Sequence, residues 1–322
     1  MAVKKNISII LAPFSIGGPN DAAEDGPKVL MNNYIDEDLE ELGFRVKVVK
    51  PPKIEMGKRN LEEKGKNRIK NIEAIIKINK WLSGVVSNEI KKGSIPLTIG
   101  GDHSLAIGTI AGVRDALNNI GVIWIDRHFD MHSPKNTPSW RAHGMPVAVA
   151  VADKNFDSHP DFQRLLSIGK SGKLPKVKLE NFVQIAIGEK SHIYPHTKWY
   201  SMEDIDNFGI KKIIESSIDY LLKRVKHIYI AWDIDSMNVT GTGTSGDGQL
   251  TLREGLIIAR AINNKIRLAG KLAGFEMVEV APKLERKDLK GQTVDWALQL
   301  ITTSFGGNLF NNLSRLKKNI KV

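Results

Sequence analysis

Short apolar runs rich in Ile and Val alternate along the chain with longer segments of helical periodicity. The longer segments, among them 66–92 and 252–272, repeat apolar residues at close to 3.6 positions, as amphipathic helices do. Continuous apolar strands that alternate with helices are typical of a parallel sheet with both faces covered. This pattern predicts one α/β domain over residues 1–322. The expected strands lie at 7–14, 46–49, 95–100, 122–126, 182–188, 227–235 and 274–280, and the other expected helices at 104–119 and 211–225.

The composition is that of an ordinary globular protein, with 41% hydrophobic and 26% charged residues among 322, which excludes a disordered chain. The chain has no Cys, so it has no disulfide framework, no thiolate metal site and no cysteine nucleophile. Any catalytic chemistry must therefore come from Asp, Glu, His, Ser or Lys. The absence of Cys also fits a reducing compartment, and we expect a cytoplasmic protein.

The formal net charge of +11 suggests a polyanionic partner such as nucleic acid or a membrane surface. The Lys residues, however, mostly alternate with apolar residues in helix-like segments, which favours solvated helix faces, and the basic tail at 314–322 is too short for a nucleic-acid module. The first apolar run contains Ser8 and Pro13, which favours a strand over a secretion signal. No run approaches the ~18 apolar residues of a membrane span. We expect a soluble protein without nucleic-acid or membrane partners.

Acidic and imidazole side chains gather at the expected ends of four strands. Side chains alternate in an extended segment, so Asp126, His128 and Asp130 would face one way, and Arg127 and Phe129 the other. Such groups are costly to crowd together unless something pairs them. Ligands of parallel sheets bind beside the carboxyl ends of the strands. The four strand ends carry Asp102, His103 and Ser104; Asp126, His128 and Asp130; Asp233 and Asp235; and Glu279.

If these strand ends converge, four carboxylates and two imidazoles share one pocket, and this set predicts a metal centre. Two divalent ions would balance the four carboxylates, and ions ~3.5–4 Å apart generate hydroxide at neutral pH. Oxygen-rich coordination without sulfur favours Mn²⁺ over Mg²⁺, Co²⁺ or Zn²⁺. Each motif alone has a structural alternative, since Asp102 or Ser104 can cap a following helix and residues 233–235 can form a turn.

Five segments carry a family resemblance, namely GGDHSLAIGT (100–109), DRHFDMHSP (126–134), HGMPVA (143–148), WDIDSMN (232–238) and MVEVAP (277–282). Through them the chain resembles the arginases of the ureohydrolase superfamily, from residues 11–27 to 304–307. The resemblance implies a three-layer αβα sandwich with a central, mainly parallel sheet. It also implies a binuclear manganese centre that hydrolyses a guanidinium group to urea and an amine, in a homo-oligomer that is a trimer or a hexamer.

All six metal-ligand positions of the family are intact in this sequence. The resemblance implies two Mn²⁺ ions per subunit and a hydroxide, held between them, that attacks the guanidinium carbon. His103 and Asp130 would bind one ion only, His128 and Asp235 the other only, and Asp126 and Asp233 would bridge the two.

Three residues would act on the reacting atoms by the same resemblance. Asp130 would also hold the proton of the hydroxide. His143 would pass a proton to the leaving amine, a role that suits an imidazole with a pKa near neutrality. Glu279 would orient the substrate, because a carboxylate matches a planar cation with several N–H donors.

The substrate-binding positions follow the arginase pattern only in part. Thr137 and Ser139 fall where arginases keep hydroxyls for the α-carboxylate, whereas His132 replaces an Asn. For the α-amino group arginases place two Asp residues after a strand. Here residues 189–191 are Glu-Lys-Ser, so Glu189 stands in for one Asp, and Lys190 and Ser191 depart from the pattern.

These observations rank the possible functions. The first hypothesis is Mn²⁺-dependent hydrolysis of L-arginine to L-ornithine and urea. The departures at His132 and Ser191 favour agmatine, a guanidino acid or formiminoglutamate as the next substrates. A non-catalytic arginase-like scaffold is a further alternative, which the intact ligand set opposes. Nucleic-acid binding through the basic surface has the least support.

Overall fold

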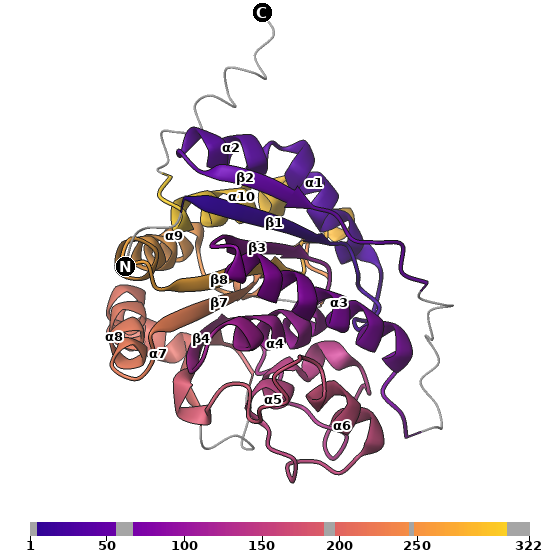
Figure 1. The fold of residues 1–322 in the computed structure, drawn as a ribbon. Helices are drawn as coiled ribbons and strands as arrows, with labels where there is room; N and C mark the ends of the chain where they lie inside the picture. The colour runs from indigo at the N-terminus through magenta and orange to yellow at the C-terminus, as the bar shows by residue number, and fades with distance from the viewer. Residues whose placement is uncertain (1–4, 56–66, 190–196, 245–247, 308–322) are drawn as a thin grey trace, which may run out of the picture.

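The computed structural model describes residues 5–55, 67–189, 197–244 and 248–307. Its centre is an eight-stranded sheet in which neighbouring strands pair in parallel, in the order β2-β1-β3-β8-β7-β4-β5-β6 (Figure 1). The strands are β1 (Asn6–Ala12), β2 (Arg45–Val49), β3 (Ile95–Gly100), β4 (Ile120–Ile125), β5 (Phe182–Ile187), β6 (Lys198–Ser201), β7 (His227–Asp233) and β8 (Leu272–Val278).

Helices cover both faces of the sheet and give it two hydrophobic cores. Apolar residues of α3, α4, α5 and α6 form the core on one face, and those of α1, α2, α7, α8, α9 and α10 form the core on the other (Figure 1). The helices are α1 (Gly26–Asn32), α2 (Ile35–Glu41), α3 (Ile72–Lys91), α4 (Ala106–Ala116), α5 (Pro146–Val151), α6 (Pro160–Leu166), α7 (Met202–Phe208), α8 (Ile210–Leu222), α9 (Leu252–Ala261) and α10 (Gln292–Ser304).

The predicted α/β fold, with a parallel sheet between two helical layers, is confirmed. Every predicted strand is present, and the predicted helix 252–272 is α9 continued by a π-helical stretch, Ile262–Arg267. The predicted elements do not include the edge strand β6 or the helices α1, α2, α5, α6, α7 and α10. No helix within the described residues is long and apolar enough to cross a membrane.

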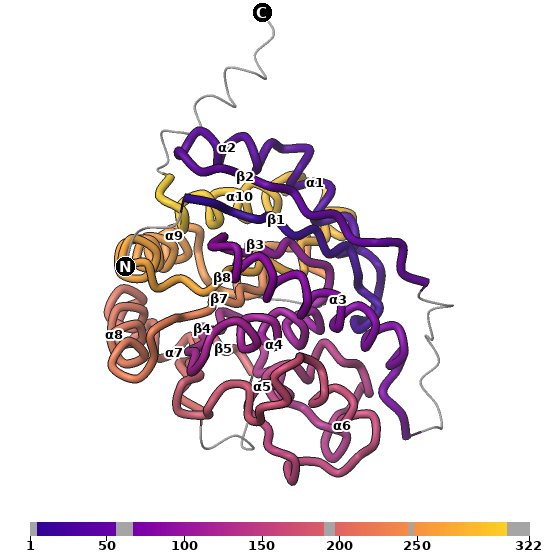
Figure 2. Tube along the Cα trace, in the orientation of Figure 1, coloured from indigo at the N-terminus to yellow at the C-terminus, as the bar shows by residue number. Residues whose placement is uncertain are grey.

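The strand order explains why distant motifs meet at one edge of the sheet. β8, the last strand in the chain, is inserted between β3 and β7, and β7 in turn pairs with β4. Figure 2 shows the orange chain of β7 and β8 beside the purple chain of β3. Because all four strands run in parallel, the residues that follow them lie at the same carboxyl edge.

Candidate metal centre

Three of these four central strands end in the same local turn. In each, the carboxylate of an Asp accepts a hydrogen bond from the backbone N–H two residues later, which a short carboxylate reaches easily. The Asp that accepts this hydrogen bond therefore shapes each turn. The pairs are Asp102 with Ser104 (2.8 Å), Asp126 with His128 (2.6 Å) and Asp233 with Asp235 (2.8 Å).

Asp102 has a structural role at the end of β3. One of its oxygens accepts hydrogen bonds from the backbone N–H groups of Gly17 (2.9 Å) and Gly18 (3.0 Å), and the other from Ser104. The capping alternative therefore holds for this residue. The next residue, His103, turns into the acidic cluster, so one short motif carries both the cap and a candidate ligand.

The His103 imidazole is buried among three carboxylates. Its Nδ1 lies 2.9 Å from Asp126, 3.2 Å from Asp233 and 3.3 Å from Asp130. One face of the ring stacks on the indole of Trp124, with 3.9 Å between ring centroids and 6° between planes. Ligand atoms of His103, Asp126 and Asp233 lie within 4.8 Å of one another, close enough for one metal ion.

A second group of candidate ligands adjoins the first. His128 Nδ1 lies 2.9 Å from Asp235 and 3.5 Å from Asp126, and ligand atoms of all three lie within 4.8 Å of one another. Asp126 belongs to both groups, as a bridging ligand would. The His128 side chain is 24% exposed, more than the other members of the two groups, so the cluster opens to solvent on this side.

The predicted extended conformation of residues 126–130 is wrong. β4 ends at Ile125, and Asp130 adopts a left-handed backbone with φ of +48°. Asp126, His128 and Asp130 nevertheless face one cluster, because turns rather than strand alternation direct them. The aliphatic part of Arg127 packs near Gly188, and its carbonyl accepts the Gly188 N–H at 2.8 Å.

The carboxylates of the cluster favour the protonated form of both histidines. Burial opposes protonation of His103, but hydrogen bonding to Asp126 and its other carboxylate neighbours outweighs burial and raises the pKa of His103 well above its ordinary value. Burial also opposes protonation of His128, and the charge of Asp235 outweighs it, so this pKa is raised too. Burial and the charge of Asp126 raise the pKa of Asp130 to about 7.

The donor set of this cluster fits a pair of divalent cations. Divalent ions would replace the protons that the imidazoles carry and offset four crowded carboxylates. The buried Oδ1 atom of Asp235 has no hydrogen-bond partner among the residues that the structure describes, and Asp235 Oδ2 accepts from Thr244 Oγ1 at 2.6 Å. His128 Nδ1 lies 2.9 Å from Asp235 Oδ2, so the orphaned Oδ1 belongs to a carboxylate that adjoins a candidate imidazole ligand.

Glu279 follows β8 and lies against the same cluster. Its backbone is left-handed, with φ of +63°, and its Oε1 accepts the His103 N–H at 3.0 Å. Its Oε2 is buried and has no hydrogen-bond partner within the described part of the chain. Burial, and then the charge of Asp233, raise the pKa of Glu279 well above its ordinary value. One anchored and one unpaired oxygen leave this group able to accept N–H donors from a cation.

His143 lies in the turn Ala142–Gly144, directly before α5. Its backbone N–H donates to Gly17 at 3.2 Å, which places this turn beside the loop that Asp102 holds. Burial, and then the positive charges of His128 and Arg141, lower the pKa of His143 to about 3. This lowered pKa differs from the near-neutral value that the sequence suggested and favours the neutral imidazole.

The expected carboxylate-binding residues lie on the loop between the cluster and His143. The Thr137 and Ser139 hydroxyls accept backbone N–H groups of Trp140 (3.0 Å) and Arg141 (3.2 Å), so each still has a proton to donate. His132 donates its backbone N–H to Gly144 at 2.9 Å, and its ring packs beside Gly144.

The candidate residues for the α-amino group are only partly described. Glu189 is exposed, and its Oε2 accepts the Phe129 N–H at 3.2 Å, which ties the segment after β5 to the loop of candidate metal ligands. Lys190, Ser191 and the basic tail at 314–322 lie outside the described residues.

Sequence reasoning missed several side chains that support the cluster. Trp124 Nε1 donates to Asp126 at 2.9 Å, while the same indole stacks on His103. Thr244 and Glu276 also touch candidate ligands. Trp124 lies in β4 and Glu276 in β8, and both strands appear in the sequence as apolar runs. A polar group inside such a run is the only sequence feature that could have indicated these two residues.

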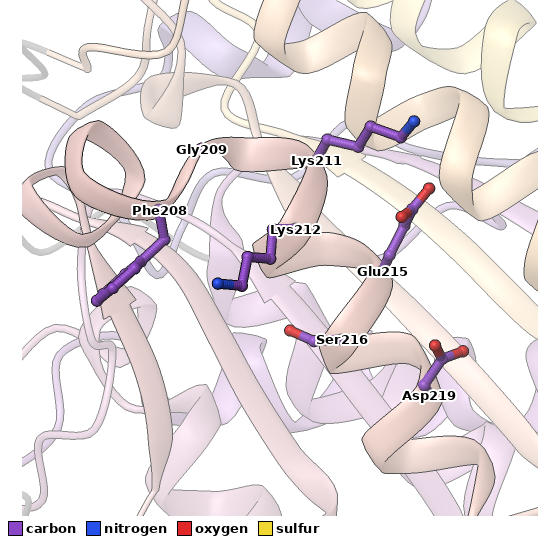
Figure 3. A pocket seen from close by; sticks show the side chains of 7 residues that line it. All are labelled: Phe208, Gly209, Lys211, Lys212, Glu215, Ser216 and Asp219. Carbon is purple, nitrogen blue, oxygen red and sulfur yellow. The ribbon is translucent and has the colours of Figure 1, made fainter.

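A separate surface pocket of about 460 Å³ opens at the start of α8. Figure 3 shows its side chains on α8 and at the end of α7, and Lys212 Nζ of α8 lies 5.6 Å from the centre of the Phe208 ring of α7. No residue of the acidic cluster lines this pocket, so we do not assign the substrate to it. Its lining residues are Phe208, Gly209, Lys211, Lys212, Glu215, Ser216 and Asp219.

Comparisons with known proteins agree with the motifs. A family model described as the arginase family matches residues 5–306. An arginase from Bacillus caldovelox is 32% identical over 314 residues, covering 95% of this chain and 99% of that protein. The solved structure of an arginase from Bacillus caldovelox has a TM-score of 0.82 at 33% identity, covering 95% of this chain and 99% of that one. A structure of Entamoeba histolytica arginase in complex with L-ornithine has a TM-score of 0.79 at 26% identity, covering 95% of this chain and 100% of that one.

Proposed function

Because the chain belongs to the arginase family, we propose that it hydrolyses L-arginine to urea and L-ornithine with two Mn²⁺ ions per subunit. The chain is a hydrolase of the ureohydrolase type, and the proposal adds its substrate and its metal. One observation carries the proposal: a buried cluster of His and Asp side chains adjoins Glu279, whose Oε1 accepts the His103 N–H and whose Oε2 has no hydrogen-bond partner within the described residues. The relative with bound L-ornithine supports an amino-acid product.

The proposed ligands follow the family pattern. His103 and Asp130 would bind one ion, His128 and Asp235 the other, and Asp126 and Asp233 would bridge them; the place of Asp126 in both ligand groups supports the bridge. When bound, two Mn²⁺ ions supply a hydroxide nucleophile from water at neutral pH.

The residues of the chain then position substrate and protons. The free oxygen of Glu279 accepts N–H donors of the guanidinium and holds its carbon in reach of attack, while Asp130 accepts a hydrogen bond from the attacking oxygen. The bond from the guanidinium carbon to the ornithine nitrogen breaks, and this nitrogen needs a proton to leave as an amine. His143 would pass that proton on as a relay, because an imidazole can accept a proton on one ring nitrogen while it releases one from the other.

Recognition of the amino-acid end would come from the loop before His143 and from the segment after β5. The Thr137 and Ser139 hydroxyls have protons available for an α-carboxylate. Glu189 is the candidate for the α-amino group, since its carboxylate is exposed beside the Phe129 backbone.

Urea release tests this proposal directly. The purified chain, loaded with Mn²⁺, is incubated with L-arginine, and urea and ornithine are measured together. The matched control is Asp130→Asn, which keeps the size of the side chain and removes its charge. Equal amounts of urea and ornithine from the wild type, above the control, are expected. Urea no higher than in the control would refute the proposal.

A second candidate is a guanidino compound other than arginine. His132 in place of an amide residue is the observation that favours it, because this ring lies beside the His143 turn where the carboxylate end would sit. A panel of L-arginine, agmatine, a guanidino acid and formiminoglutamate, ranked by kcat/KM, separates the candidates. A higher kcat/KM for any of the others than for L-arginine would replace arginine as the substrate.

A further inference from the structure

Glu276 is a buried carboxylate in the middle of β8 that the proposed reaction does not use. It is 0% exposed, and its neighbours in the strand, Phe275 and Met277, are buried apolar residues. One carboxylate oxygen accepts the Thr109 hydroxyl of α4 at 2.8 Å. The other, Oε1, makes no hydrogen bond of ordinary geometry among the described residues, and the buried Tyr229 hydroxyl nearby is a second candidate donor to this carboxylate. An ionisable group in such a place is costly unless it serves a partner.

The free oxygen of Glu276 faces the far side of the His103 ring. His103 Nε2 lies 4.0 Å from Glu276 Oε1, and this nitrogen makes no hydrogen bond within the described residues. The opposite ring nitrogen, Nδ1, points at the carboxylates of Asp126, Asp130 and Asp233. The ring therefore lies between a carboxylate cluster on one edge and a single carboxylate on the other.

This arrangement decides which nitrogen of His103 can bind a metal. A ligating nitrogen must be unprotonated, so the proton of the neutral imidazole must lie on Nε2 if Nδ1 is the ligand. An Nε2–H needs an acceptor, and Glu276 Oε1 is the buried acceptor that faces it. A hydrogen bond at ~2.9 Å requires the two atoms to approach by about 1 Å.

We propose that Glu276 is a positioning residue for the metal centre, which accepts the Nε2–H of His103 and thereby fixes the ring with Nδ1 toward the ion. The proposal rests on the proposed function, because it presupposes a metal at His103. The Trp124 indole fixes the plane of the ring, and the backbone N–H of His103 is held by Glu279. Glu276 completes these contacts of His103 by holding the ring proton on Nε2.

Three single variants separate positioning from packing. Glu276→Met removes the acceptor and keeps an apolar side chain of similar length. Glu276→Gln keeps an acceptor oxygen without the charge. Thr109→Val is the matched control, because it deletes the other hydrogen bond of the same carboxylate and leaves Oε1 facing His103. Circular dichroism and thermal melting establish that each variant is folded.

Mn²⁺ affinity is the main readout, measured by competition with a chelator and by the spin-coupled signal of a manganese pair in electron paramagnetic resonance. Outer partners of metal-bound histidines typically change metal affinity 10- to 100-fold. We expect Glu276→Met to weaken one of the two Mn²⁺ sites by about that factor. Thr109→Val should stay close to the wild type and Glu276→Gln should fall between. For turnover, kcat should fall in Glu276→Met at saturating Mn²⁺ while KM is unchanged.

The outcomes distinguish this proposal from the proposed function. Equal Mn²⁺ affinity in wild type and Glu276→Met would overturn the positioning role alone. An equal loss in Thr109→Val and Glu276→Met would also overturn it, since packing would then explain both. A wild-type chain that binds no Mn²⁺ would overturn the proposed function and the positioning role together.

Discussion

Substitution of Gly243 by Ala should move the Glu279 carboxylate without disturbing the fold. A Cβ at Gly243 would overlap Glu279 Oε2, the oxygen that we expect to bind the guanidinium. The backbone of Gly243 cannot retreat easily, because its N–H donates to the Glu279 carbonyl (3.0 Å) and its carbonyl accepts from Asn20 (2.8 Å). The backbone angle φ of Gly243 lies outside the left-handed range, so the effect of Ala is steric. The side chain of Glu279 must therefore give way.

The size of the effect follows from what that movement breaks. Glu279 Oε1 accepts the His103 N–H at 3.0 Å, and the loss of this bond would leave a buried N–H unpaired at a cost of about 1–3 kcal/mol. A displacement of about 1 Å at a positioning group typically lowers a rate about 100-fold, which corresponds to about 2.7 kcal/mol of transition-state stabilisation. We expect kcat/KM for L-arginine to fall about 100-fold. The free energy of unfolding should fall by no more than about 3 kcal/mol.

Urea kinetics and chemical unfolding, run on the same preparations, test this expectation. The matched control is Gly84→Ala in α3, where an added Cβ meets no atom within 4 Å. That variant should be about 0.5–1 kcal/mol more stable, because Ala favours a helix over Gly, and should keep full activity. Wild-type kcat/KM in Gly243→Ala would refute the proposed place of Glu279 in substrate binding.

Three further predictions use other parts of the structure. Asp126→Asn should reduce bound Mn²⁺ from two ions to at most one, since Asp126 belongs to both ligand groups; elemental analysis that still finds two ions would contradict the bridge. His143→Ala should lower kcat by about 10²–10⁴ while two Mn²⁺ ions stay bound, and added imidazole should restore part of the rate; an unchanged kcat would exclude the proton transfer. Burial lowers the pKa of Lys176 to about 8, so the unfolded chain binds more protons than the folded one between pH 8 and 10.5. The free energy of unfolding should therefore rise with pH across this window by about 3 kcal/mol more in wild type than in Lys176→Met, and parallel pH profiles in urea unfolding would contradict this.

The sequence predicts the central strands and the longer helices well because each of them has a clear local pattern. The buried strands are continuous apolar runs, and residues 211–225 and 252–261 show the helical repeat of α8 and α9. β6 escapes this reasoning because it is a four-residue edge strand, KWYS, which is only partly buried and has no apolar run. The local sequence pattern is thus sufficient to predict the sheet and the helical layers, but it does not reveal a short edge strand.

The residues of the candidate site can be predicted from the sequence, but the turns that direct their side chains cannot. The spacing of Asp126, His128 and Asp130 identified the group, but strand alternation was the wrong reason for their common direction. A left-handed residue at Asp130 and a side-chain turn at Asp126 produce it instead. Neither conformation has a signal in residue type alone, since Asp tolerates both turns and strand ends.

The supporting residues depend on strand order, which no local pattern contains. Glu276 and Glu279 lie far along the chain from His103, yet one faces its ring and the other holds its backbone. Both contacts exist because β8 is inserted between β3 and β7. That close fit requires Gly274, where a Cβ would press on Pro96 of β3 and on Tyr229 of β7. The insertion of one late strand thus brings both glutamates to the imidazole that is proposed to bind the metal.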